Sequence, residues 1–174
     1  MLELKALGSD LPGIARLAIA NFLHTNARVD LGRPGAPRAP VFVTLRSLDG
    51  SLRGCIGSLI AIEPDVASET ARSAVLAATR DPRFPPVRSE ELQKLHIEVS
   101  VLLPEEPVTN FDELDPQRYG VVVRDDSGRQ GLLLPEVPGV DTAELQVEIA
   151  RRKAGIEPEA SVTMRRFEVV KFSE

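Results

Sequence analysis

Residues 41–58, VFVTLRSLDGSLRGCIGS, decide the fold that this sequence predicts. Polar and apolar residues alternate on both sides of Asp49-Gly50, a dipeptide suited to the two positive-φ positions of a type I′ turn. We therefore expect a β-hairpin with strands over 41–48 and 51–58. A two-residue turn sets the register, and three facing pairs follow: Leu48 with Ser51, Arg46 with Arg53, and Thr44 with Cys55.

The predicted hairpin has one apolar and one polar face, because side chains alternate along a strand. The apolar face should pack on the core and holds Val41, Val43, Leu45, Leu52 and Ile56. The polar face holds Thr44, Arg46, Arg53 and Cys55. Two arginines directly opposite each other destabilise a sheet unless an anion lies beside them. A carboxylate of the protein or of a ligand is therefore expected at this place.

Gly54 and Gly57 interrupt the second strand, where glycine often marks a bulge or a close backbone approach. Together with Cys55, the single cysteine of the chain, they predict the floor of a small pocket. Neighbouring cations favour the thiolate form, which suits a nucleophile. The alternative interpretation is that Cys55 is a small buried hydrophobe and that the arginines are solvated.

Two further segments are expected to face the same pocket. The stretch 81–86, DPRFPP, stops a helix and presents Asp81, Arg83 and Phe84 on a stiff loop. In the strand 97–101 the apolar residues take one face, so Glu98 takes the other. Glu98 either pairs with Arg53 or moves a proton beside Cys55. The predicted site consists of Cys55 and Glu98 as catalytic candidates, and of Thr44, Arg46, Arg53, Gly54, Gly57, Asp81, Arg83 and Phe84 as ligand-binding candidates.

The remaining pattern predicts an α+β fold, with a mostly antiparallel sheet flanked by helices. Helices are expected over about 10–22, capped by Ser9 or Asp10, over 65–80, and after a capping box of Asp141 and Glu144. Gly155 is expected to end the last helix in the left-handed conformation. Strands are expected over 96–103, 119–124, 131–134 and 162–172.

Composition excludes several classes of protein. The 174 residues carry a net charge of −5 and only 4% aromatic residues, which argues against nucleic-acid binding. One cysteine excludes an internal disulfide. Residues 11–23 are too short and too interrupted to span a bilayer, so a cytoplasmic protein without membrane contact is expected. No cofactor fingerprint and no metal-ligand spacing is present, so neither a cofactor nor a metal site is predicted.

Five blocks resemble the signature of the AMMECR-one domain family, whose bacterial members are called AmmeMemoRadiSam system protein A. The blocks occur in the family's order: LRGCIG (52–57), DPRFPP (81–86), IEVSVL (97–102), GLLLP (131–135) and KAG (153–155). The resemblance covers essentially the whole chain and implies one domain over 1–174 with a smaller second lobe. It also implies association with a Memo-like protein and a radical-SAM enzyme. Relatives often have a Cys where this chain has Arg151 and a Trp after the KAG block, which is absent here.

Three functions remain open at this point. The first is a binding module for a small anionic ligand or a partner segment, acting with the radical-SAM and Memo-like proteins. The second is an enzyme that uses Cys55 as thiolate with Arg53 and Glu98 in an anion-binding cleft. Nucleic-acid binding through local arginine stripes is the third.

Overall fold

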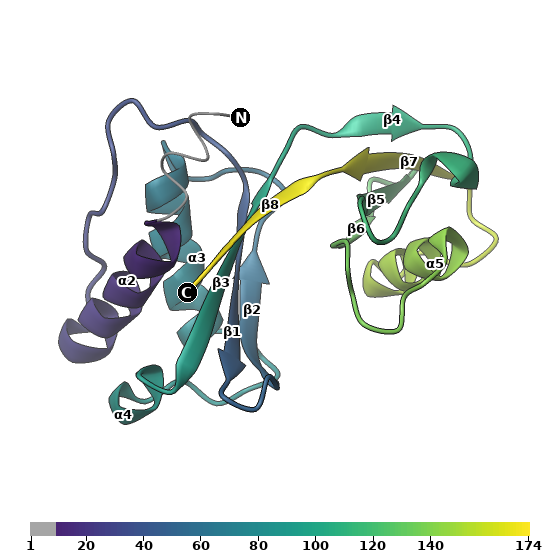
Figure 1. Ribbon diagram of the computed structural model, residues 1–174. Coiled ribbons are helices and arrows are strands. Elements are labelled where there is room, and N and C mark those ends of the chain that lie inside the picture. The colour runs from purple at the N-terminus through teal and green to yellow at the C-terminus, as the bar shows by residue number, and fades with distance from the viewer. Residues whose placement is uncertain (1–9) are drawn as a thin grey trace. The chain divides into compact units, whose positions relative to one another are not determined.

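The computed structural model describes residues 10–174, which form two compact units (Figure 1). The first unit takes in the chain up to Leu102 together with Val170–Glu174, and the smaller second unit is Leu103–Val169. Each unit contains a four-stranded sheet of its own. The expected α+β architecture with a smaller second lobe is therefore confirmed.

The first unit has two long helices on one side of its sheet (Figure 1). The helices are α2 (Leu11–Thr25) and α3 (Val66–Thr79), and a short helix α4 (Ser89–Leu92) precedes the third strand. The sheet order is β2-β1-β3-β8. Its strands are β1 (Val41–Ser47), β2 (Leu52–Gly57), β3 (Leu95–Leu102) and β8 (Val169–Ser173). Strand β1 is antiparallel to both β2 and β3.

Local signals explain where these helices begin and end. Asp65 caps α3, because its Oδ1 accepts hydrogen bonds from the N–H groups of Ala67 and Ser68. Helix α2 runs three residues beyond the predicted end and stops at Asn26, which is left-handed with φ 56°. Asp10 makes no side-chain cap, and Ser9, the other predicted cap, lies outside the described residues.

The core of the first unit lies between the helices and one face of the sheet. Val41, Val43 and Leu45 of β1 are completely buried there, as predicted for the apolar face of the hairpin. Small side chains on α3, such as Ala74 and Ala77, let the helix approach the strands closely. The alternation of apolar residues in β1 therefore determines which face of the sheet the helices cover.

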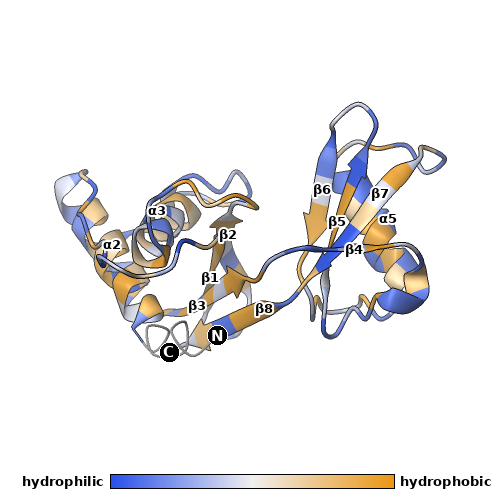
Figure 2. Ribbon diagram, turned by 90° about the horizontal axis from the view of Figure 1, so that it is seen from above, coloured by the Kyte–Doolittle hydropathy of each residue, from blue (hydrophilic) through white to orange (hydrophobic). Residues whose placement is uncertain are grey.

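The second unit packs one helix on its sheet (Figure 2). Helix α5 (Ala143–Lys153) contacts β5 (Gly120–Asp125) and β6 (Gln130–Leu133). The sheet order is β4-β7-β5-β6, with β4 (Glu106–Val108) and β7 (Val162–Phe167) completing it. A 3-10 turn, η1 (Phe111–Glu113), follows β4.

Two predictions for the second unit are wrong and one is confirmed. Thr142, not Asp141, is the N-cap of α5, and its hydroxyl accepts a hydrogen bond from the Leu145 N–H at 3.3 Å. The single strand predicted over 162–172 is divided at Glu168 into β7 and β8, which belong to different sheets. Gly155 follows α5 with φ +63°, the left-handed conformation that was expected.

Candidate functional site

The hairpin turn differs from the prediction, but Thr44 and Cys55 still face each other. Gly50 has φ +82° while Asp49 does not have a positive φ, so the turn is not type I′. Instead the Gly50 N–H donates to the Ser47 carbonyl. The partner of Ser51 across the turn is therefore Ser47, whose N–H donates to the Ser51 carbonyl, and not Leu48 as predicted. Both predicted pairs next to the turn, Leu48 with Ser51 and Arg46 with Arg53, are therefore wrong.

A β-bulge at Arg53 restores the predicted register farther along the hairpin. Arg46 pairs with Leu52, whereas Leu45 pairs with Gly54, so Arg53 is the extra residue of β2. The turn has one residue more than predicted, which shifts the pairing by one position. The bulge shifts it by one position in the opposite direction, so the two shifts cancel. Thr44 and Cys55 consequently pair as predicted. Arg46 stays near the turn, where its Nη1 donates to the Gly50 carbonyl at 3.2 Å.

The 81–86 loop closes the open edge of the sheet at Cys55. Strand β2 is an edge strand. The Cys55 N–H donates to Oδ2 of Asp81 at 2.8 Å, and the Cys55 carbonyl accepts from Nη2 of Arg83 at 3.4 Å. Asp81 also accepts from Nε and Nη2 of Arg83 at 2.9 and 2.7 Å. This ion pair thus takes the place that a neighbouring strand would occupy and protects the edge.

Arg53 pairs with Glu91 of α4, so the predicted pairing with Glu98 is wrong. Nε of Arg53 lies 2.5 Å from Oε1 of Glu91, and Nη2 lies 3.1 Å from Oε2. The Arg53 side chain is 13% exposed, and its third nitrogen, Nη1, is buried without a hydrogen-bond partner among the described residues. Both Arg53 and Arg83 approach the ring of Phe84, with guanidinium carbons 5.9 and 5.5 Å from its centroid.

These contacts define a surface that we call the β2-edge patch. The patch consists of Arg53, Cys55, Asp81, Arg83, Phe84 and Glu91. Sequence reasoning missed Glu91, because a glutamate in the first turn of a short helix reads as an ordinary helix-start acid. The signal that could have found it is the expectation of a carboxylate beside Arg53, combined with the nearness of 89–92 to the 81–86 loop.

Hydrogen bonds to arginine set the charge state of the patch. The Arg83 side chain holds the pKa of Asp81 well below its usual range, although burial acts in the opposite direction. Arg53 lowers the pKa of Glu91 in the same way. Asp81 in turn raises the pKa of Arg83. Both carboxyl groups are therefore ionised near neutral pH.

Gly54 and Gly57 serve close packing at two different places. A Cβ built on Gly54 would lie 2.3 Å from the Ala77 carbonyl oxygen of α3. A Cβ built on Gly57 would lie 2.3 Å from the ring of Phe42. No larger residue fits at either position without moving its neighbour. The close approach expected of these glycines is confirmed, and Gly54 faces the helix rather than the polar face of the hairpin.

Cys55, Thr44 and Glu98 form a row across the sheet. Thr44 pairs with Cys55 on one side and with Glu98 of β3 on the other, so their side chains share the face that α2 and α3 do not cover. The Thr44 hydroxyl donates to the Cys55 sulfur at 3.4 Å, and Cys55 is partly exposed. Adjacent strands lie about 5 Å apart, which puts Glu98 roughly 10 Å from Cys55.

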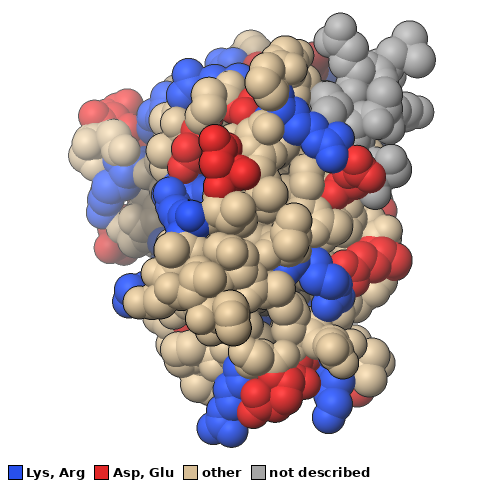
Figure 3. Space-filling model, turned by 90° about the vertical axis from the view of Figure 1, so that its left-hand side faces the viewer, with Lys and Arg blue, Asp and Glu red and all other residues tan. Residues whose placement is uncertain are grey.

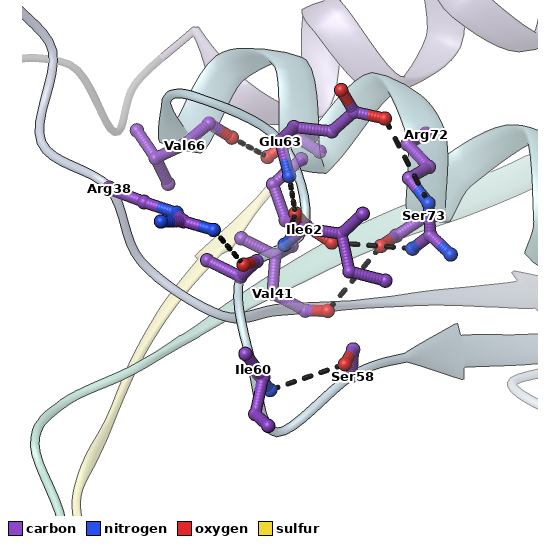
Figure 4. Close-up of polar contacts among 12 residues, drawn as sticks. Arg38, Val41, Ser58, Ile60, Ile62, Glu63, Val66, Arg72 and Ser73 are labelled. Carbon is purple, nitrogen blue, oxygen red and sulfur yellow. Dashed lines mark hydrogen bonds and ion pairs between the residues drawn. The ribbon is translucent and has the colours of Figure 1, made fainter.

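A second polar centre, which sequence reasoning did not find, supports the loop after β2 (Figure 4). Glu69 of α3 is completely buried, and its Oε2 accepts from the N–H groups of Ile62 and Glu63 at 2.6 and 2.7 Å. Arg38 donates to the Ala61 carbonyl at 2.6 Å in the same loop. A carboxylate inside a helix rich in small residues is the signal that could have revealed it.

Residues 10–174 contain neither a cluster of metal-ligating side chains nor a helix that could cross a membrane. No group of three or more His, Cys, Asp or Glu side chains there could hold a metal ion. In the same part of the chain, no helix has the length and apolar character needed to cross a membrane.

Comparison with known proteins identifies relatives along almost the whole chain. The AMMECR1 family model matches residues 12–172. A Thermotoga maritima protein is 50% identical over 136 residues, which are 78% of each chain. A Clostridium acetobutylicum protein is 42% identical over 134 residues, which are 77% of this chain but only 28% of that longer protein. The crystal structure of an uncharacterized Pyrococcus horikoshii protein superposes with a TM-score of 0.86 at 32% identity, covering 97% of this chain and 92% of that one.

Proposed function

This chain belongs to the AMMECR1 family, and on that premise we propose that it is a binding module whose β2-edge patch holds a small anion or a carboxylate of a partner segment. The buried Nη1 of Arg53 carries this proposal. A buried donor without an acceptor costs roughly 1–3 kcal/mol. A carboxylate or phosphate oxygen that displaces the side chains covering Nη1 would remove that cost.

The charges around the patch favour an anion. Arg53 and Arg83 belong to the patch, and the positive charge of exposed Arg88 lies near enough to help lower the pKa of Glu91. Three arginines therefore face two carboxylates, Asp81 and Glu91, which leaves one positive charge. The fork of donors on a guanidinium group matches the oxygens of a carboxylate or phosphate.

The surface beside the patch suits a partner chain. Arg83 is 53% exposed, Phe84 is half-buried, and the three prolines of the 81–86 loop are exposed. A stiff loop loses little conformational entropy when a partner docks on it. The proposed partners are the radical-SAM enzyme and the Memo-like protein implied by the family resemblance.

Co-purification with the radical-SAM enzyme of the same source tests this function. Arg53→Lys keeps the charge but removes the guanidinium fork, and we expect it to lower recovery of the complex about tenfold. Cys55→Ser should leave recovery unchanged. Arg152→Lys, the same change at an exposed position of α5, is the matched control. Equal recovery with Arg53→Lys and with the control would show that the patch does not bind the partner.

A thiol enzyme is the second candidate, supported by the Thr44 hydroxyl that donates to Cys55. Such a donor stabilises a thiolate. Titration of thiol alkylation against pH measures this directly, with Thr44→Val as the variant. If the thiol of the native protein does not react below the pH at which a free cysteine reacts, Cys55 is not an activated nucleophile.

A further inference from the structure

A cavity of about 460 Å³ lies along helix α5 in the second unit. Its floor is apolar, because Val147 of α5 and Ile156 of the following loop, both buried, line it. Phe111 of η1 and Pro158 add further apolar surface. Ligand pockets typically measure about 300–1,000 Å³ and are lined mainly by apolar side chains, so the cavity suits a small organic molecule.

The ring of Phe111 is the large apolar group at this cavity that folding leaves uncovered. Phe111 is 41% exposed. The η1 turn that carries it is nevertheless fixed, because Oε1 of Glu113 accepts hydrogen bonds from the N–H groups of Thr109 and Asn110 at 2.9 and 3.3 Å. A fixed ring loses little conformational freedom when a ligand packs on it. It also favours an aromatic ligand, since rings pair in offset-stacked or edge-to-face contacts.

The loop after α5, which also lines the cavity, is held by Arg151. Its Nη1 donates to the carbonyl groups of Glu157, Pro158 and Ala160 at 3.1, 3.2 and 2.8 Å. The guanidinium group of this half-buried arginine therefore serves the backbone of the loop. Both η1 and the loop are thus positioned before any ligand arrives.

The charged side chains of the lining carry an excess of one negative charge. They are three glutamates and two arginines: Glu144, Glu148, Glu157, Arg151 and Arg152. Arg152 pairs with Glu148, whereas Glu144 makes no ion pair with any residue that the structure describes. The lining therefore favours a ligand with one positive charge and disfavours an anion.

Glu144 and Glu148 lie on the same stripe of α5. They are four residues apart, an arrangement in which like charges on a helix repel each other. Arg152, four residues further on, compensates Glu148 but not Glu144. On the face drawn in Figure 3, by comparison, acidic and basic side chains are interspersed. A cation beside Glu144 and Glu148 would relieve their repulsion.

We infer that this cavity binds an aromatic amine, that is, a flat apolar ring system with one ammonium group. The ring lies between Val147 and Phe111, and the ammonium group lies beside Glu144 and Glu148. The site belongs to the second unit, whereas the β2-edge patch belongs to the first. It is therefore independent of the anion proposed for that patch.

Titration of the full chain with tryptamine, followed by NMR of the backbone amides, tests the inference. Tryptophol has the same ring and linker with a hydroxyl in place of the ammonium group, and indolepropionate has a carboxylate there. We expect saturable shifts at Phe111 and over 144–148 with tryptamine. The affinity should be about three- to tenfold lower for tryptophol and lower still for indolepropionate. Equal affinities of the three probes, tightest binding of indolepropionate, shifts confined to other positions, or no saturable shift up to about 10 mM, a very weak affinity, would overturn the assignment.

Variants separate the charge of this site from its apolar part. Glu144 is exposed, so Glu144→Gln preserves the fold. It should remove most of the preference for tryptamine over tryptophol and leave the affinity for tryptophol unchanged. Phe111→Ala should weaken all three probes about threefold or more. Glu90→Gln, the same change on the exposed surface of the first unit, and Arg53→Lys should leave tryptamine binding intact. A preference for tryptamine that Glu144→Gln does not reduce contradicts the inference.

Discussion

Replacement of Asp81 by Asn should destabilise the first unit through the clamp on the edge of β2. The carboxylate accepts four hydrogen bonds: from the N–H groups of Cys55 and Arg83, and from Nε and Nη2 of Arg83. The asparagine amide has the same shape but only one acceptor oxygen. Its NH₂ group takes the place of the second carboxylate oxygen and cannot accept from the two N–H donors that face it. Two of the four bonds are therefore lost.

The size of the effect follows from the burial of each partner. A hydrogen bond to a charged group contributes roughly 1.5–3 kcal/mol. The bond from Arg83 counts for less, because about half of that side chain is in water, whereas the Cys55 N–H is left without its acceptor. We expect a loss of about 3 kcal/mol, and a melting temperature lower by roughly 6–12 °C for a chain of this size.

Denaturant unfolding at several pH values measures how much free energy of unfolding the variant loses and shows whether the loss comes from the charge of Asp81. The pKa of Asp81 is lowered in the folded protein, so its contribution is complete above the unfolded pKa of about 3.9 and disappears as the pH falls through the lower, folded pKa. The free energy of unfolding of the native protein should exceed that of the variant by the same amount at pH 7 and at about pH 5. This difference should become smaller only in stronger acid.

Asp141→Asn is the matched control, since Asp141 is exposed and lies just before α5. This change should alter stability by no more than about 0.5 kcal/mol. If Asp81→Asn is as mild as the control, or if its effect already vanishes near pH 5, the ion pair does not clamp the edge strand.

Four other substitutions probe close packing and hydrogen bonds. Gly54→Ala should cost about 1–3 kcal/mol, because its Cβ meets the α3 backbone, while Gly13→Ala, with nothing within 4 Å in α2, should stabilise by about 0.5–1 kcal/mol in thermal unfolding. Glu69→Gln should accelerate amide hydrogen exchange across the loop 58–63, and unchanged exchange would show that the buried carboxylate does not hold it. Arg151→Leu removes donors to three carbonyls of the loop after α5 and should increase its proteolysis; a resistant loop would contradict this role.

The fold follows from patterns that are local in the sequence. Alternation over 41–58 identifies the hairpin and its buried face, and Gly155 identifies the end of α5. These features depend on side-chain periodicity and backbone conformation, which a few neighbouring residues determine. The turn type was missed because Asp49-Gly50 also suits a turn in which only the glycine has a positive φ.

The partners of charged side chains could be decided only by the tertiary structure. The alternation of the strand places Glu98 on the same face as Cys55, but it does not reveal that Arg53 leaves the ladder at a bulge and pairs with Glu91. Charge–charge interactions act through space over several ångströms, whereas periodicity reports only the direction in which each side chain leaves its own strand or helix.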